Sequence, residues 1–386
     1  MTNREKDKII LVVQSLRTGG AERYMTGLAN ALSKSKKVFL ILEDDIREIE
    51  VNPDVSICVA NKTQFKKSLK LSMACSAYSI IKKIGRFNKF ERDLGKYIYW
   101  RGSSEKIWNL IEDIGTVDVI SMMTDINIKL LMGAKRHNNH LFPIHCNAPQ
   151  DIDASGKELT ALVERYYPMA TKVVMPTESM KVLFPKNIQE KTVIIANPLP
   201  NGLPSKYNGV RKKRIVNFCR LSPVKNIPML FEAFKKFHIN HPDYYVEIFG
   251  NGEEKEKLLS FIKEHHLEEA IYLRPFNSNI HECIVDSTMY VSTSNYEAFS
   301  NSVLEAMAIG IPVIATDCPS GGSRAMITNG VNGLLIPVGD VDSLYHAMIY
   351  IAENGVEAEK MANEAIKVRD EYSQENIADQ FLNMLI

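Results

Sequence analysis

The sequence predicts an α/β protein made of two doubly wound domains. An apolar strand, Ile9–Val13, precedes a glycine-bearing loop, a helical run at Ala21–Leu32 and a second apolar strand at Val38–Leu42. This order indicates a βαβ unit, because parallel neighbouring strands need a crossover connection. A stretch rich in Pro, Gly and Asn, residues 196–209, then reads as a linker, and the βα pattern restarts at Ile215–Phe218. Two sheets in tandem are therefore expected.

Further short apolar runs predict the remaining strands. In the first half they are Val117–Ser121, Leu141–His145, Lys172–Met175 and Thr192–Ile195. In the second half they are Tyr245–Phe249, Ala270–Leu273, Met289–Val291, Pro312–Ala315 and Gly333–Ile336. The last segment, Ser373–Ile386, predicts an amphipathic helix. Open parallel sheets bind ligands beyond the carboxyl ends of their strands, so two such domains predict a ligand-binding cleft.

Composition and charge exclude several classes of protein. The 386 residues carry 47 Lys and Arg against 46 Asp and Glu, a balance that argues against a dedicated nucleic-acid binder. The longest uncharged run, Ala325–Gly339, is shorter than the roughly 20 apolar residues of a spanning helix. The polar start MTNREKDK lacks an apolar signal core, so a cytoplasmic protein is expected. The six cysteines never form Cys-x-x-Cys, which favours neither a zinc site nor a disulfide framework.

Two glutamates eight residues apart, Glu297 and Glu305, are the most specific chemical signal. Glu297 follows a predicted strand, and Glu305 falls about one turn into a helix predicted over Asn301–Ala308. The free N–H groups at a helix N-terminus suit a diphosphate, and two carboxylates can accept hydrogen bonds from two sets of sugar hydroxyls. The alternative is a capping box formed by Ser302 and Glu305, with Glu297 as a solvated acid.

Two cations five residues apart, Arg220 and Lys225, lie between the strand Ile215–Phe218 and a helix that starts near Asn226. Such a pair at the carboxyl end of a strand can clamp a diphosphate and stabilise it as a leaving group. The alternative is a pair of surface cations at a helix start, where positive charge is mildly destabilising without an anion. The ligand-binding interpretation is therefore favoured.

Three glycine turns follow predicted strands: Gly19-Gly20, Gly250-Asn251-Gly252 and Ser320-Gly321-Gly322-Ser323. Glycines permit a close approach of backbone to a ligand, but they are equally typical of ordinary tight turns. The third turn also presents backbone amides that suit an anion.

Four segments together resemble glycosyltransferase family 4, whose members are retaining, nucleotide-sugar-dependent enzymes of the GT-B fold. They are LRTGGAERYMTGLANAL, CRLSPVKNIPMLFEAF, NYEAFSNSVLEAMAIGIPVIATDCPSGGSRAMITNGVNGLLIP and YSQENIADQF. The resemblance implies two Rossmann-like domains facing across a cleft, with an acceptor-binding domain at 1–197 and a nucleotide-sugar-binding domain at 198–372. A C-terminal helix at 373–386 would return to the first domain. The resemblance is thinner between about residues 45 and 140, as expected for an acceptor-binding region.

The resemblance also implies roles for the charged motif residues. Glu297 would hold hydroxyls of the transferred sugar, and Glu305 would hold the ribose hydroxyls of the nucleotide. Arg220 and Lys225 would grip the diphosphate as the glycosidic bond breaks. The implied mechanism is front-face attack, in which the acceptor hydroxyl approaches from the side on which the diphosphate leaves.

Five uncharged or neutral positions are implied as well. Phe299, Ser300 and Asn301 would place backbone amides near the sugar and phosphates. Gly20 would let the N-terminal domain close against the donor. His145 occupies the place of the family's cleft histidine at a strand end, and the alternative for it is a core histidine satisfied by the backbone.

The sequence departs from the family after the third glycine turn, where many relatives carry a proline and a glutamate. Here Arg324 and Ala325 follow Ser323, so a carboxylate role at this place has no residue to perform it. Asp151 and Asp153 form an Asp-x-Asp, which holds a metal in another glycosyltransferase fold. Because the GT-B architecture generally works without a bound metal, a solvated loop is the favoured interpretation, and neither a metal nor another cofactor is expected.

Residues 61–101 carry eleven basic residues against two acids. The basic residues are Lys62, Lys66, Lys67, Lys70, Lys82, Lys83, Arg86, Lys89, Arg92, Lys96 and Arg101. Apolar residues recur every three or four positions from Leu69 to Phe87, which predicts a basic amphipathic helix. Such a helix can lie in an anionic membrane interface, and the alternative is a helix packed on its own domain with a solvated basic face.

The sequence thus predicts a retaining glycosyltransferase at the cytoplasmic face of the inner membrane. It would move a sugar from a nucleotide diphosphate, with a UDP-sugar as the expected donor, to a lipid-linked or oligosaccharide acceptor. Such a step belongs to capsule, O-antigen or related polysaccharide biosynthesis. The alternatives are a sugar-nucleotide epimerase of the same architecture, a glycogen- or sucrose-synthase-like enzyme with a soluble acceptor, and a non-catalytic glycan-binding relative.

Overall fold

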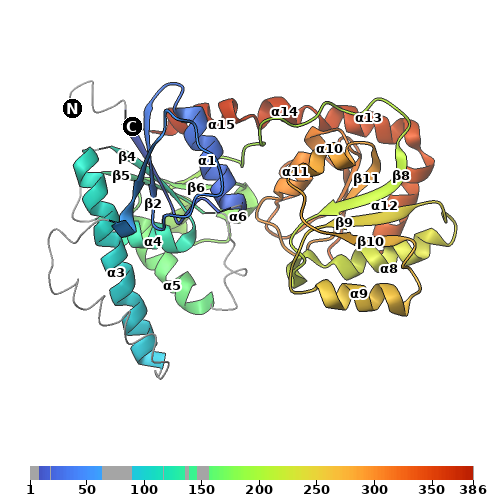
Figure 1. Cartoon of the computed structure of the whole chain (residues 1–386), viewed down its shortest axis with the longest axis horizontal. Coiled ribbons are helices and arrows are strands. Elements are labelled where there is room, and N and C mark those ends of the chain that lie inside the picture. The colour runs from blue at the N-terminus through green and yellow to red at the C-terminus, as the bar shows by residue number, and fades with distance from the viewer. Residues whose placement is uncertain are drawn as a thin grey trace. The chain divides into compact units, whose positions relative to one another are not determined.

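The computed structural model describes residues 8–17, 19–62, 89–115, 117–134, 139–145 and 156–385. The chain divides into two compact units (Figure 1). The N-terminal unit comprises Met1–Met175, Lys181–Ile195 and Ala378–Ile386, and the C-terminal unit comprises Pro176–Met180 and Ala196–Ile377.

The N-terminal unit is built on a seven-stranded parallel sheet with the order β3-β2-β1-β4-β5-β6-β7. Its strands are β1 (Lys8–Val13), β2 (Lys37–Leu42), β3 (Ser56–Val59), β4 (Asp118–Met122), β5 (His140–Ile144), β6 (Val173–Met175) and β7 (Thr192–Ile194). Its helices include α1 (Gly20–Leu32), α3 (Lys89–Ile114), α4 (Thr124–Gly133) and α5 (Gly156–Tyr166), and the short α6 (Glu178–Lys181) and α7 (Lys186–Gln189) follow β6. Strand order reverses between β1 and β4, which makes this the doubly wound arrangement.

The C-terminal unit is built on a six-stranded parallel sheet with the order β10-β9-β8-β11-β12-β13. Its strands are β8 (Lys212–Phe218), β9 (Tyr245–Phe249), β10 (Ile271–Arg274), β11 (Ser287–Ser292), β12 (Val313–Thr316) and β13 (Leu334–Ile336). Its helices are α8 (Ile227–His238), α9 (Lys255–Glu264), α10 (Ile280–Ile284), α11 (Asn301–Ala308), α12 (Val341–Glu353), α13 (Gly355–Ala365), α14 (Val368–Glu371) and the start of α15 (Gln374–Met384). Strand order reverses here between β8 and β11.

Both faces of the C-terminal sheet are apolar because both are covered by helices (Figure 1). Alternate residues of one strand point to opposite faces, so Ile215 joins the core beneath α8 and α12, whereas Val216 joins the core beneath α11. Met289 and Tyr290 of β11 divide in the same way. This two-sided burial explains why the strands read in sequence as continuous apolar runs and do not alternate with polar residues.

The predicted fold class is confirmed, and every predicted strand is present with bounds that differ by three residues at most. The helix predicted over Asn301–Ala308 has those bounds. Sequence analysis missed β3, a four-residue strand at the sheet edge that is only half-buried and therefore lacks a strong apolar pattern. The C-terminal helix is also present, and its residues from Ala378 group with the N-terminal unit.

The stretch 196–209 forms neither helix nor strand, as predicted, but it is fixed to the C-terminal unit. Leu199 is buried and its N–H donates to Tyr372 O at 2.7 Å. Arg369 donates to Pro204 O and, through Nε, to Ala308 O. Within the described ranges, no helix combines the length and apolar character that crossing a membrane requires.

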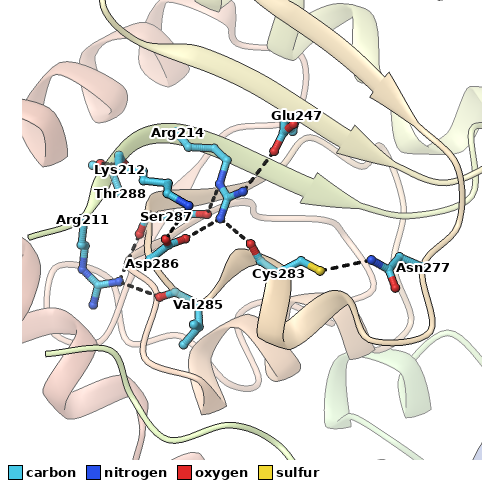
Figure 2. A network of polar contacts seen from close by, with 10 residues as sticks. All are labelled: Arg211, Lys212, Arg214, Glu247, Asn277, Cys283, Val285, Asp286, Ser287 and Thr288. Atoms are coloured by element: carbon cyan, nitrogen blue, oxygen red, sulfur yellow. Dashed lines mark hydrogen bonds and ion pairs between the residues drawn. The ribbon is translucent and has the colours of Figure 1, made fainter. Parts of the chain in front are cut away.

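A buried cation secures the amino-terminal end of the C-terminal sheet (Figure 2). The guanidinium of Arg214 donates to Glu247 at 3.1 Å and to Ser287 Oγ at 2.8 Å. Its Nη2 donates to Cys283 O and to Asp286, both at 2.6 Å. Four partners from three parts of the unit thus satisfy most of the N–H groups of one buried arginine.

Replacing Arg214 should destabilise the fold strongly. Arg214→Ala leaves buried acceptors at Ser287 and Cys283 and weakens the neutralisation of Glu247, so we expect a loss of about 3 kcal/mol in the free energy of unfolding. Calorimetric unfolding measures the change. The control is Lys213→Ala on the same strand, whose exposed pair with Asp243 should matter little. Equal melting temperatures for the two variants would contradict the assignment.

Candidate functional site

The predicted site residues of the C-terminal unit gather where its strand order reverses. Arg220 and Lys225 lie in the connection after β8, Glu297 lies in the connection after β11, and Glu305 lies on α11. Strands β8 and β11 are hydrogen-bonded neighbours. Ligands of doubly wound sheets bind at such a switch point, so the topology brings these residues to the expected edge.

Lys225 and Glu297 form an ion pair between the two connections. Lys225 Nζ contacts Glu297 Oε1, and the side chains are 21% and 13% exposed. Ser294 Oγ donates to the same carboxylate oxygen at 2.7 Å. Both contacts use Oε1, which leaves Oε2 to accept a hydrogen bond from a ligand.

The electrostatics keep this lysine charged. Burial disfavours the ammonium, but the charge and hydrogen bond of Glu297 outweigh burial, so the pKa of Lys225 is raised above its ordinary value. Two nearby thiols stay neutral, because burial raises the pKa of Cys219 to about 12 and that of Cys318 to about 11. Neutral thiols add no second negative charge to compete for the lysine.

Backbone contacts fix Lys225 against the loop that carries Glu297. Lys225 ends a short 3₁₀ turn, and Asn226 then takes the left-handed conformation (φ 46°, ψ 44°) that turns the chain into α8. Asparagine tolerates this conformation better than most residues. Thr293 Oγ1 donates to Lys225 O at 3.0 Å, and Asn295 N donates to Val224 O at 2.8 Å. The ion pair therefore rests on two loops that are bound to each other.

Glu305 is paired as well, but with a residue that sequence analysis did not single out. His281 Nε2 lies 2.8 Å from Glu305 Oε2, with both side chains largely buried. Ser302 does not cap the helix: its hydroxyl accepts from Tyr290, and Ser300 holds the N-cap position without a side-chain bond. The capping-box alternative for Ser302 and Glu305 is therefore wrong, and Glu305 keeps Oε1 for a ligand.

Arg220 is placed differently from Lys225. Its side chain is 73% exposed, and Nη2 contacts Glu253 at 3.3 Å. The second glycine turn follows β9 and lies against this loop: Gly250 has a φ of 156°, and a Cβ there would overlap Cys219 O. Gly252 is equally tight against the neighbouring carbonyl. These glycines therefore serve the close packing of two loops.

The residues between the two glutamates begin α11. Phe299 is buried, with its ring 5.9 Å from that of Tyr372. Ser300 is the buried N-cap residue, and Asn301 accepts a hydrogen bond from Asn197 Nδ2 at 2.8 Å. Their side chains thus serve packing, while the N–H groups of the first helical turn remain those that an anion can use.

The N-terminal unit holds the other two predicted residues. Gly20 is the first residue of α1 after the N-cap Gly19. His145 follows β5 and is 1% exposed, with Nδ1 2.8 Å from Tyr167 OH. Asn127 Nδ2 donates to the same hydroxyl at 3.0 Å. A side-chain network, and not the backbone, therefore orients the ring of His145.

Several predictions fall outside the described residues. Asp151 and Asp153 do, as do the basic side chains of residues 66–96. At the other departure from the family, Arg324 Nε donates to Asp317 at 2.6 Å. Among the residues that the structure describes, no three His, Cys, Asp or Glu side chains group as a metal site.

Comparison with known proteins follows the same division of the chain. Residues 205–368 match the family model described as Glycosyl transferases group 1. An uncharacterized glycosyltransferase of Haemophilus influenzae is 23% identical over 95% of this chain and 96% of its own length. The N-acetylgalactosamine-N,N'-diacetylbacillosaminyl-diphospho-undecaprenol 4-alpha-N-acetylgalactosaminyltransferase of Campylobacter jejuni is 25% identical over 98% of this chain and 99% of its own.

Among solved structures, TarM of S. aureus superimposes with a TM-score of 0.76 at 15% identity, over 98% of both chains. This likeness shows the fold, and it is that of GT-B glycosyltransferases. The comparisons do not favour the epimerase or the non-catalytic alternative. Taken with the matched segment and the two full-length relatives, they support a glycosyltransferase.

Proposed function

We propose that the protein is a retaining glycosyltransferase of family 4 that moves a sugar from a UDP-sugar to a lipid-linked or oligosaccharide acceptor of a bacterial surface polysaccharide. One observation carries the proposal: a charged lysine, Lys225, is paired with Glu297 at the switch point of the sheet. Residues 1–197 would bind the acceptor, and residues 198–372 would bind the donor.

The donor fits the arrangement of charges. Lys225 keeps protons beyond the one engaged by Glu297, so it can bind a phosphate oxygen without leaving the carboxylate. Glu305 Oε1 is available to ribose hydroxyls, and the exposed Arg220 can reach a second phosphate by rotating its side chain. The S. aureus protein TarM has been solved in complex with UDP. That complex supports uridine diphosphate as the nucleotide of this chain.

The chemistry needs no protein nucleophile. In front-face transfer the bond from the anomeric carbon to the diphosphate breaks while a bond from that carbon to the acceptor oxygen forms on the same side. The acceptor's proton passes to the leaving phosphate oxygen. Lys225 stabilises the negative charge that develops on this oxygen, and Glu297 holds the sugar in place while the bonds exchange. Neither a metal nor another cofactor takes part in this scheme.

The acceptor and the stereochemistry are inferred from the full-length relative. The name of the Campylobacter protein gives an alpha linkage and a diphospho-undecaprenol acceptor. Hexoses are commonly carried by UDP in the alpha configuration, so an alpha product corresponds to retention. A lipid-linked acceptor places this chain at the cytoplasmic membrane surface. The exposed Tyr97 and Tyr99 of α3, 45% and 40% accessible, border the basic segment 61–101 and suit a membrane interface.

Donor binding should raise the melting temperature. UDP at a hundredfold excess over its Kd should add about 2.7 kcal/mol to stability by mass action, with or without magnesium. Lys225→Ala and Glu305→Ala should each abolish most of the shift, because they remove the phosphate and ribose contacts. Differential scanning fluorimetry compares each variant with and without UDP, and the same variants should lose transfer.

The matched control is Lys213→Ala, which removes a lysine from an ion pair at the opposite edge of the same sheet. It should keep the full shift with UDP. If UDP does not stabilise the wild-type chain, or if Lys225→Ala keeps the shift, the donor site is assigned to the wrong residues.

Membrane contact should depend on anionic lipid. The chain should sediment with vesicles that contain phosphatidylglycerol and not with vesicles of phosphatidylcholine alone, since each cation near the surface contributes about 1 kcal/mol. Replacing Lys82, Arg86 and Lys89 with alanine should release it. Replacing Lys34, Lys36 and Lys37, an equal number of cations between α1 and β2, should not. Sedimentation that ignores lipid charge would exclude the interfacial helix.

A further inference from the structure

The backbone of Glu297 is held by a hydroxyl from outside the motif. Ser320, fully buried in the turn after β12, donates its Oγ to Glu297 O at 2.6 Å. Gly322 follows so closely that a Cβ at this position would overlap the same carbonyl. The third glycine turn therefore fits against the loop of Glu297 and fixes its backbone.

A second hydroxyl fixes the turn in its place. Thr177 is 3% exposed, and its Oγ1 donates to Ser320 O at 3.0 Å. The same oxygen accepts from Met180 N at 3.1 Å, so the backbone of α6 orients the hydroxyl. The one proton of the hydroxyl is thus directed at Ser320, and two buried backbone groups depend on one side chain.

Continuous hydrogen bonding now connects Thr177 to the ion pair: Thr177 to Ser320, Ser320 to Glu297, and Glu297 to Lys225. The far end of this relay lies in Pro176–Met180, which groups with the C-terminal unit although the residues on both sides of it group with the N-terminal unit. The relay therefore ends where the chain passes from one unit to the other.

We propose that Thr177 and Ser320 are positioning residues for Glu297, so that recognition of the donor sugar depends on the seating of Pro176–Met180. This inference rests on the proposed function, because it assumes that Glu297 holds the transferred sugar. Thr177 touches no substrate and acts through Ser320. The glutamate must be held within a fraction of an ångström to bind the sugar productively, which is why a single remote hydroxyl matters.

The relay separates sugar recognition from nucleotide recognition. Thr177→Val keeps the shape of the side chain but leaves Ser320 O and Met180 N without their partner. Lys225 and Glu305 are untouched, so the Kd for UDP should stay within about twofold of wild type. The Kd for the better bound of UDP-glucose and UDP-N-acetylglucosamine should rise about fivefold, the cost of about one hydrogen bond. Isothermal titration calorimetry measures both constants.

Two variants frame the result. Thr177→Ser restores the hydroxyl and should restore the advantage of the UDP-sugar over UDP. Thr288→Val is the matched control, because Thr288 Oγ1 also donates to a backbone carbonyl, that of Lys212, at 2.6 Å, at the opposite edge of the sheet. It should change neither constant. An unchanged UDP-sugar advantage in Thr177→Val, or an equal loss in Thr288→Val, overturns the inference.

Hydrogen exchange distinguishes failure of the relay from failure of the donor assignment. Without any ligand, the amides of residues 294–299 should exchange faster in Thr177→Val than in wild type, and not in Thr288→Val. If exchange rises but wild-type chain binds no UDP, the relay exists while the proposed donor site is wrong. If exchange is unchanged while UDP binds the wild-type chain, the relay itself is wrong.

Discussion

The ion pair between Lys225 and Glu297 is the interaction on which the rest of the site depends. A lysine in this half-buried place needs a nearby anion, and the glutamate that supplies it comes from the connection after the neighbouring strand. The pairing raises the pKa of Lys225, so the residue stays cationic in spite of burial. The two buried thiols beside it stay neutral and leave its field uncompensated except by Glu297. A ligand phosphate then meets a fixed positive charge.

The two ends of the C-terminal sheet use buried charge differently. At the amino-terminal end, Arg214 is surrounded by acceptors that use most of its N–H groups, and this network can only hold the fold together. At the carboxyl end, both contacts of Glu297 fall on one oxygen, and Glu305 is engaged through one oxygen by His281. Spare hydrogen-bonding capacity at one end, beside full satisfaction at the other, marks the carboxyl end as the one that binds a ligand.

Most of this fold could be predicted from sequence, because a parallel sheet covered on both faces produces long apolar runs with glycine turns between them. The edge strand β3 escaped because it is short and half-buried. The acidic and basic site residues were found because their spacing fits a strand–loop–helix pattern. What sequence could not give is the partner of each: His281, 24 residues before Glu305, has no local signal that connects it to the glutamate.

Ser294 and Thr177 illustrate the same limit at different distances. Ser294 lies in a polar run directly before Glu297, and attention to that run would have identified it as a candidate partner. Thr177 reaches the turn of Ser320 across 143 positions, and only the folded chain brings the two together. Ser302 shows the opposite error, since its local pattern suggested a cap while tertiary packing gave its hydroxyl to Tyr290.

The most direct test of this account is a crystal structure of the protein with UDP. The account predicts a phosphate oxygen within hydrogen-bond distance of Lys225 Nζ, ribose hydroxyls on the carboxylate of Glu305, and Glu297 still in contact with Lys225. UDP bound elsewhere, or bound at the switch point with its phosphates away from Lys225, would contradict the central claim that this ion pair forms the donor site.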